Sequence, residues 1–417
     1  MSKPGIKIKA TELRVGMRIQ RLGGSWMQHP FLRGRFILED PADIQRIIDA
    51  GIQEVWISDG GDTTMNATLD DDALGMEAAD VLAPPMVAEP VAAPPPAVAP
   101  AVARPKPARS MELDVERARK VCHNARDQVA NMFQQARLGK AIDTQATLPL
   151  VDAIQAEVQR NASAILSVAR LKAHDDYTYM HSVAVCALML ALARQLNLDE
   201  EQTRLAGIGG LTHDLGKMFV PLEILNKPAR LSNEEFEVMK LHPAAGAKAL
   251  ADSQATPAAI DIALHHHEKV NGRGYPHALK GDEISLLARM GAVCDVYDAV
   301  TSIRAYKKPW DPAMSIREMA RWDGDFDKRV FNAFVKSVGI YPVGSLVKLA
   351  SNRLAVVVEQ GGDSLLHPKV RVFFSLRSNE PIQANTLDLA APGCKDSIVG
   401  PEDPERWGFK NLELLWQ

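Results

Sequence analysis

The chain has 417 residues, a length sufficient for two or three domains. Its hydrophobic content of 46% is ordinary for a soluble globular protein. Its formal net charge of −4 argues against a general binder of DNA or RNA polymers but allows a local positive pocket for a phosphate substrate. The four cysteines form no C-x-x-C pair, and there is neither a signal-peptide core nor an apolar run near the ~20 residues of a spanning helix, so we expect a cytoplasmic protein without membrane insertion.

The first predicted unit is a small α/β domain in residues 1–72. One helical segment at 41–50, which Gly51 ends, lies among four short β-like runs. The runs are residues 6–8, 17–22, 35–38 and 54–58. Nothing in this unit indicates a ligand, and we expect a regulatory or homodimer-forming role.

Residues 73–110 are predicted to form a linker. Positions 83–108 hold nine prolines and nine alanines. Such a composition cannot build a core, and its prolines favour a stiff, extended chain. The linker therefore separates the α/β domain from the remainder.

Helical periodicity dominates residues 111–338, and capping-box patterns at Asp199 to Gln202 and Ser232 to Glu235 mark two helix starts. Residues 339–417 instead show β-like runs at 346–349, 354–359 and 370–374, broken by Gly, Asn and Pro. The expected fold is mainly α: a helical bundle with a small α/β N-terminal domain and a short β-rich C-terminal extension.

Histidines gather in the predicted bundle, where eight of the eleven lie between His174 and His277. His213 and Asp214 end a helix before Gly216, and small residues on the His213 face let another backbone approach. Those small residues are Ala206, Gly209 and Gly210. An adjacent imidazole and carboxylate at a helix end can turn into one cavity, where the carboxylate can bridge two cations.

Two further ionisable residues lie on apolar helix faces. Asp295 shares its face with Leu287 and Ala288, and His181 shares its face with Val185 and other apolar residues. A lone carboxylate there costs several kcal/mol unless it is paired or bound to a metal. A lone buried histidine is more often an ordinary core residue, but its companions favour a metal site here.

Only two of the three residues His265, His266 and His267 can face one cluster, because successive helical residues point about 100° apart. His242, before Pro243, is a further candidate ligand or else a polar residue in a solvated turn. Imidazoles and carboxylates without thiolates suit transition metals rather than a structural zinc. Two such ions can clamp a phosphate for displacement, so the pattern predicts hydrolysis of a phosphate ester.

These residues resemble the HD-GYP family. His213-Asp214-Leu215-Gly216-Lys217 resembles its HDxGK motif, and His266-His267-Glu268 followed by Gly272-Arg273-Gly274-Tyr275-Pro276 resembles its extended signature. The pattern continues at His242-Pro243 and Asp295-Val296-Tyr297-Asp298, so that it covers residues 111–338. Residues 5–60 are similar to the small uncharacterised domain that often precedes HD-GYP domains.

The resemblance implies an HD-type bundle around a dinuclear metal site, with Asp214 as the bridge between two divalent ions. The implied ligands are His181, His213, Asp214, His242, His266, His267 and Asp295. Iron or manganese is expected, with zinc, nickel or magnesium as alternatives. Some members bind a third metal through a glutamate where this chain has Tyr177, so we expect two ions.

Other residues are implied to bind substrate. Lys217 would steady the scissile phosphate, and Arg304 and Lys307 would hold a cyclic dinucleotide. Asp298 is expected to hydrogen-bond a ligand histidine or a backbone group and so to fix its orientation. Asn271 stands where the signature commonly has aspartate, which changes loop hydrogen bonds without removing an expected ligand. His265 is expected beside the cluster or at the surface, and His174 and His277 as ordinary loop residues.

The resemblance implies a phosphodiesterase that cleaves cyclic di-GMP to pGpG or GMP by means of a hydroxide held between the metals, with Asp214 and Lys217 as catalytic residues. Gly274, Tyr275 and Pro276 would shape the substrate pocket or bind diguanylate cyclases, the GGDEF proteins. Two alternatives stay open. The chain could be an HD phosphohydrolase for another nucleotide, or a sensor or scaffold with little turnover.

Overall fold

The computed structural model describes residues 6–22, 36–38, 40–49, 52–57, 111–171, 177–227, 229–302, 309–361, 364–409 and 412–416. The chain divides into two compact units, Met1–Ala108 and Arg109–Gln417. The expectations for His174, Arg304, Lys307 and the linker fall outside the described residues. Within the described ranges, no helix has the length and apolar character needed to cross a membrane.

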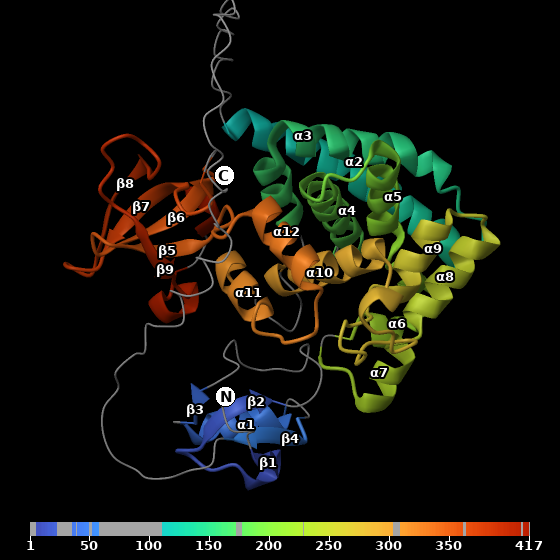
Figure 1. The fold of residues 1–417 in the computed structure, drawn as a ribbon, viewed down its shortest axis with the longest axis horizontal. Helices are drawn as coiled ribbons and strands as arrows, with labels where there is room; N and C mark the ends of the chain where they lie inside the picture. The colour runs from blue at the N-terminus through green and yellow to red at the C-terminus, as the bar shows by residue number, and fades with distance from the viewer. Residues whose placement is uncertain are drawn as a thin grey trace, which may run out of the picture. The chain divides into compact units, whose positions relative to one another are not determined.

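The first unit contains a four-stranded antiparallel sheet of order β1-β4-β2-β3 and one helix, drawn in blue in Figure 1. Its elements are β1 (Ile6–Lys9), η1 (Ala10–Glu12), β2 (Arg18–Leu22), β3 (Phe36–Ile37), α1 (Pro41–Asp49) and β4 (Glu54–Ile57). Ile19, Ile47 and Val55 are fully buried between helix and sheet. These elements confirm the predicted α/β fold class.

The second unit begins with a helical bundle (Figure 1). Its main helices are α2 (Met111–Arg137), α3 (Leu148–Arg170), α4 (Tyr177–Gln195), α5 (Glu200–Thr212), α8 (His242–Asp252), α9 (Pro257–His265), α10 (Leu286–Thr301), α11 (Pro312–Met319) and α12 (Lys328–Val338). Shorter pieces are η6 (Leu215–Phe219), α6 (Leu222–Leu225) and α7 (Asn233–Met239). The mainly helical prediction is confirmed.

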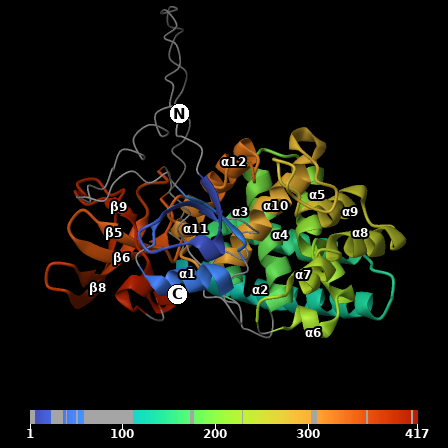
Figure 2. The ribbon, with the colours of Figure 1, turned by 90° about the horizontal axis from the view of Figure 1, so that it is seen from below.

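Helix α4 is the centre of the bundle (Figures 1 and 2). Every residue from 183 to 193 is buried, because α2, α3, α5, α10 and α12 all pack on it. On the α2 side, the ring of Phe133 meets the ring of Tyr179 edge to face, with centroids 5.8 Å apart. Because Tyr179 lies two residues before His181, α2 supports the helix that carries this histidine.

The two predicted helix starts are present. The side chain of Asp199 accepts a hydrogen bond from the backbone N–H of Gln202, and Ser232 and Glu235 form a reciprocal capping box. Helix α3 has a kink that was not predicted, at Asn161, whose φ is −157°. The side-chain oxygen of Asn161 accepts from the N–H of Ala164 and so starts the second half of the helix.

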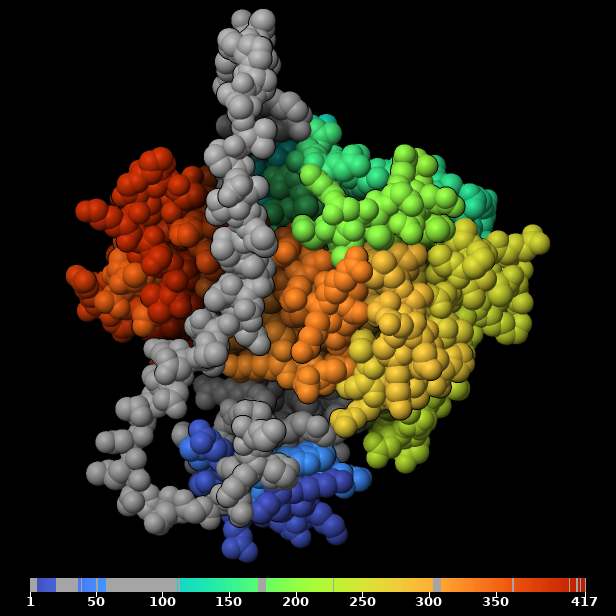
Figure 3. Space-filling model, in the orientation of Figure 1, coloured from blue at the N-terminus to red at the C-terminus, as the bar shows by residue number. Residues whose placement is uncertain are grey.

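The C-terminal part of the second unit is an antiparallel five-stranded sheet of order β8-β7-β6-β5-β9, whose red surface forms a lobe to the left of the orange and yellow helices in Figure 3. Its strands are β5 (Leu346–Leu349), β6 (Arg353–Glu359), β7 (Lys369–Ser375), β8 (Glu380–Asp388) and β9 (Ile398–Pro401). Asp311 ties sheet to bundle, since its carboxylate caps α11 and also accepts from the N–H of Leu346. The β-rich extension is confirmed, while the domain boundaries stay predictions.

Candidate metal centre

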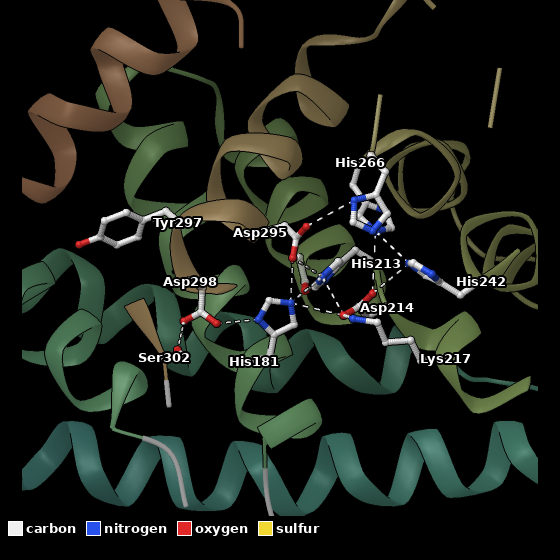
Figure 4. Close-up of polar contacts among 12 residues, drawn as sticks. His181, His213, Asp214, Lys217, His242, His266, Asp295, Tyr297, Asp298 and Ser302 are labelled. Carbon is white, nitrogen blue, oxygen red and sulfur yellow. Dashed lines mark hydrogen bonds and ion pairs between the residues drawn. The ribbon is translucent and has the colours of Figure 1, made fainter. Parts of the chain in front are cut away.

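Five separated stretches of the bundle bring the implied ligands together, and Figure 4 shows their polar ends turned toward one shared space. His181 lies on α4, His213 and Asp214 lie between α5 and η6, and His242 begins α8. His266 and His267 follow α9, and Asp295 lies on α10. All but His267 are buried, so the cluster is an interior feature of the protein.

Glycines permit this convergence. A Cβ at Gly216 would overlap the carbonyl oxygen of His242, so only glycine lets η6 approach the start of α8. On the neighbouring helix α5, a Cβ at Gly210 would lie 2.8 Å from Cα of Cys186 in α4, and one at Gly209 would overlap Ile262 of α9. The small residues beside His213 therefore allow the close approach that their pattern predicts.

Asp214 lies between two groups of imidazoles. Its Oδ2 is 3.3 Å from Nε2 of His181 and 3.4 Å from Nε2 of His213. Its Oδ1 is 3.3 Å from Nε2 of His242 and 3.8 Å from Nε2 of His266. Oδ1 is also a buried atom that has no hydrogen-bond partner among the described residues. A carboxylate with one oxygen toward each group is placed to bridge two cations.

Asp295 completes the cluster from α10. Its Oδ1 is 3.0 Å from Nε2 of His181, and its Oδ2 is 3.6 Å from Nδ1 of His267. Among the residues that the structure describes, three sets of donors have ligand atoms within 4.8 Å of one another. These sets are His181, His213 and Asp295; His242, His266 and His267; and His213, Asp214 and His266. The first two sets share no residue, and the third links them.

In four histidines, the Nδ1 atom faces away from the cluster and forms a hydrogen bond that fixes the orientation of the ring. Nδ1 of His213 donates to the carbonyl of Gly210 at 2.9 Å, and Nδ1 of His242 donates to the carbonyl of Met239 at 2.8 Å. Nδ1 of His266 likewise faces two carbonyls of α9, and Nδ1 of His181 faces a carboxylate. A carbonyl only accepts, so a neutral ring held in this way presents an unprotonated Nε2 to the cluster.

These Nε2 atoms face one another. Nε2 of His181 and His213 are 3.2 Å apart, and Nε2 of His242 and His266 are 3.4 Å apart. Nitrogen lone pairs at such distances repel unless a proton or a cation lies between them. Together with the Asp214 and Asp295 carboxylates, they form a donor set compatible with divalent metal ions.

The pKa shifts of the cluster favour protonation states that are compatible with metal binding. Burial raises the pKa of Asp214, but Lys217 and His213 outweigh it and hold that pKa well below its ordinary value. Burial lowers the pKa of His266, and the neighbouring imidazoles lower it further. Burial also lowers the pKa of His267 to about 3. Ionised carboxylates and neutral imidazoles are the protonation states that bind metals.

His181 carries the opposite shift. Burial lowers its pKa, but hydrogen bonds with Asp214, Asp295 and Asp298 outweigh this and raise the pKa to about 9. Three carboxylates that would retain a proton on this ring would also attract a cation in its place. Asp298 bonds Nδ1 of His181 at 2.6 Å, which is the orienting role that the sequence predicts.

The Gly-Tyr-Pro loop borders the cluster. The Tyr275 ring lies 4.8 Å from the His267 ring at an interplanar angle of 30°. Lys217 forms an ion pair with Asp214 and is partly exposed at the edge. His265 lies outside the cluster, with Nδ1 2.7 Å from Asp261 and Nε2 3.0 Å from His277.

Sequence reasoning gave no role to Glu268. This buried carboxylate accepts hydrogen bonds from the backbone N–H groups of His277 and Leu279, at 2.7 and 3.1 Å, and so shapes the loop from inside. A glutamate directly after the histidine pair and before the two loop glycines, Gly272 and Gly274, was a usable signal for such a role.

Two family models match consecutive parts of the chain. The family model of a domain of unknown function, DUF3391, matches residues 5–147, and the HD domain model matches residues 152–330. The Pseudomonas aeruginosa protein Cyclic di-GMP phosphodiesterase PA4108 is 51% identical over 98% of this chain and 95% of its own length.

Two further relatives match over shorter stretches. The Xanthomonas campestris protein Cyclic di-GMP phosphodiesterase response regulator RpfG is 39% identical over 35% of this chain and 39% of its own. The Vibrio cholerae protein 3'3'-cGAMP-specific phosphodiesterase 1 is 32% identical over 42% of this chain and 42% of its own. Since the near full-length match and the HD domain model agree with the signature in the sequence, the chain belongs to the HD-GYP proteins and carries a DUF3391 domain at its N-terminal end.

Proposed function

We propose that this protein is a metal-dependent phosphodiesterase that hydrolyses cyclic di-GMP to pGpG, GMP or both. The observation that carries the proposal is the convergence of four inward-facing Nε2 atoms on the carboxylates of Asp214 and Asp295. The name of the relative that is 51% identical supports the substrate.

The donor sets suggest how two ions would be held. His181, His213 and Asp295 would bind one ion with Oδ2 of Asp214, and His242, His266 and His267 would bind the other with Oδ1. Iron or manganese is the metal that the family resemblance implies, and the nitrogen and oxygen donors of the site are compatible with either. When bound, two divalent ions activate water and neutralise charge on an attacked phosphate.

The protein's own groups support the same reaction. Lys217, at the exposed edge of the cluster beside Asp214, would offset negative charge on the phosphate and its leaving oxygen. Tyr275 over His267 would help to exclude water from that side of the site. Gly274, Tyr275 and Pro276 would border the bound dinucleotide. The roles of Arg304 and Lys307 rest on the family resemblance alone.

A second cyclic dinucleotide is favoured by one comparison, because a relative is named as specific for 3'3'-cGAMP. That substrate has the same phosphodiester linkages and would need the same metal chemistry. A cytoplasmic location, homodimer formation and binding of GGDEF proteins through the Gly-Tyr-Pro loop remain predictions.

The test is a hydrolysis assay on protein purified without oxygen and analysed for bound metal. We expect close to two metal ions per chain, conversion of cyclic di-GMP to linear products and loss of turnover on chelation. Asp214→Ala is the control, with an unchanged helical circular dichroism spectrum and no turnover. Tight binding without hydrolysis would indicate a sensor, and turnover of 3'3'-cGAMP alone would indicate the second substrate.

A further inference from the structure

The loop after the histidine pair is a closed unit. Asn271 pairs with Lys280 in an isolated antiparallel bridge, and the N–H of Gly281 donates to the carbonyl of Val270 at 3.1 Å. Inside the loop, the Glu268 carboxylate accepts two backbone N–H groups. These internal hydrogen bonds make the loop compact, so we expect an attachment at its base to help position its tip as well.

That base is attached to the turn between α11 and α12. The N–H of Asn271 donates to the carbonyl of Gly324 at 2.8 Å, and the N–H of Val270 lies 3.3 Å from the carbonyl of Asp325. The side chain of Asp325 adds two contacts. Its Oδ1 accepts from Nδ2 of Asn271 at 3.0 Å, and its Oδ2 pairs with Nζ of Lys269 at 2.6 Å.

Both polar atoms of the Asn271 side-chain amide form hydrogen bonds. Its Nδ2 donates to Asp325, while its Oδ1 accepts from the backbone N–H of Arg273 at 2.9 Å. A carboxylate at position 271 could still accept from Arg273, but its other oxygen would face the Asp325 carboxylate. Asn271 is also the position where the sequence departs from the signature, and Asp325 is the partner that requires a donor there.

The tip of this loop reaches the metal cluster. The N–H of Tyr275 donates to the carbonyl of His267 at 3.3 Å, and the Tyr275 ring lies against the His267 ring. A shift of the loop base therefore moves Tyr275 relative to a histidine that the proposed function makes a metal ligand.

We propose that Asp325 is a positioning residue for the Gly-Tyr-Pro loop, acting through Asn271 and Lys269. The inference rests on the proposed function, since it assigns the loop a part in holding the cyclic dinucleotide. Asp325 lies 54 residues from Asn271 in sequence and touches no member of the cluster in the described structure. Its effect is expected on substrate binding and on the mobility of the loop.

A double-mutant cycle with exchanged groups tests this. Asn271→Asp places two carboxylates face to face and is expected to lower kcat/KM for cyclic di-GMP about tenfold, mainly through KM. Asp325→Asn retains an amide hydrogen bond and is expected to cost less than about threefold. The double variant N271D/D325N restores a donor and an acceptor in reversed order, and its activity should return close to that of Asp325→Asn.

Hydrogen exchange gives a readout that needs no turnover. Amides of residues 269–275 should exchange faster in Asn271→Asp and recover protection in the double variant. Asp323→Asn, an exposed aspartate of the same turn, is the matched control and should change neither exchange nor KM.

Two results would overturn the inference. One is a double variant as impaired as Asn271→Asp. The other is a loosened loop in Asn271→Asp with an unchanged KM. If the wild-type protein turns over no cyclic di-GMP, the proposed function fails separately, and the exchange cycle alone decides whether Asp325 positions the loop.

Discussion

The metal cluster and the C-terminal sheet bury opposite kinds of side chain: ionisable groups in the cluster and apolar groups in the sheet. In strands β5, β6 and β7 every buried residue is apolar, so the sheet interior is stabilised by removing hydrocarbon from water. In the cluster, His181, His213, Asp214 and Asp295 are buried with their polar atoms facing one another. Burying so many ionisable groups lowers stability unless their charges are balanced, and cations held by this donor set would contribute to that balance. The contrast predicts that substitutions in the cluster change activity, whereas substitutions inside the sheet change stability.

The largest expected effect is on turnover, and it should differ between the adjacent residues His265 and His266. His266→Ala should lower cyclic di-GMP turnover by about a thousandfold and remove bound metal, because it deletes a donor from the cluster. His265→Ala, the matched control, should stay within about tenfold, because its ring lies outside the cluster. Turnover and metal content of the two variants check this. Equal losses would mean that the cluster does not discriminate between the two rings.

A substitution inside the sheet should lower the free energy of unfolding and leave kcat unchanged. Leu349 is fully buried, and Leu349→Ala should lower the free energy of unfolding by about 2–5 kcal/mol through lost burial and a residual cavity. Denaturant unfolding measures this change. The kcat of the folded protein should be unchanged, and a fall in kcat with retained fold would break the separation between the two regions.

A residue behind the cluster sharpens the comparison. Asp298→Asn should weaken metal affinity by about 10- to 100-fold, because the carboxylate that orients His181 loses its charge. Ser302→Ala is the control, since its hydroxyl is 3.4 Å from Oδ1 of the same carboxylate, whereas His181 contacts Oδ2. Metal titration followed by activity measurement compares them. An unaltered metal affinity in Asp298→Asn would exclude the orienting role.

The smallest effect is a pH dependence at the junction of bundle and sheet. Burial raises the pKa of Asp311 to about 6 despite hydrogen bonds from Leu346 and Met314. The folded state thus holds this proton more tightly than the unfolded state, whose pKa is near 3.8. Stability should fall by about 2 kcal/mol as pH rises from 4 to 6 and then level off.

Asp311→Asn removes that titration while keeping a side-chain oxygen for the cap. The difference in free energy of unfolding between wild type and variant, measured at several pH values, isolates the contribution from other carboxylates. A difference that does not change across this window would contradict the raised pKa.

The sequence allowed the cluster to be predicted because each member lay in a short local pattern. His213-Asp214 lay beside glycines, and Asp295 stood on an apolar face. Asp325 was not predictable in this way, since its contact with Asn271 depends on how two distant turns meet. Only its surroundings in the fold give this aspartate a function.

The sheet shows the same limit. Strand β8 was not predicted, because most of its residues are exposed and its sequence, Glu-Pro-Ile-Gln-Ala-Asn-Thr-Leu-Asp, lacks a clear alternation of apolar and polar residues. It is a strand because the backbone of β7 offers it a partner. The kink at Asn161 also arises locally from a side-chain cap that periodicity does not register.

Helix α2 has a consequence for how this chain can be divided. The DUF3391 family model extends to residue 147 and so includes α2, yet this helix folds with the second compact unit and places Phe133 against Tyr179. The stretch that the family model covers is therefore not the stretch that folds as one compact unit. Removing all residues that the DUF3391 model covers would remove α2 from the bundle, whereas a cut after residue 108 would leave α2 in place.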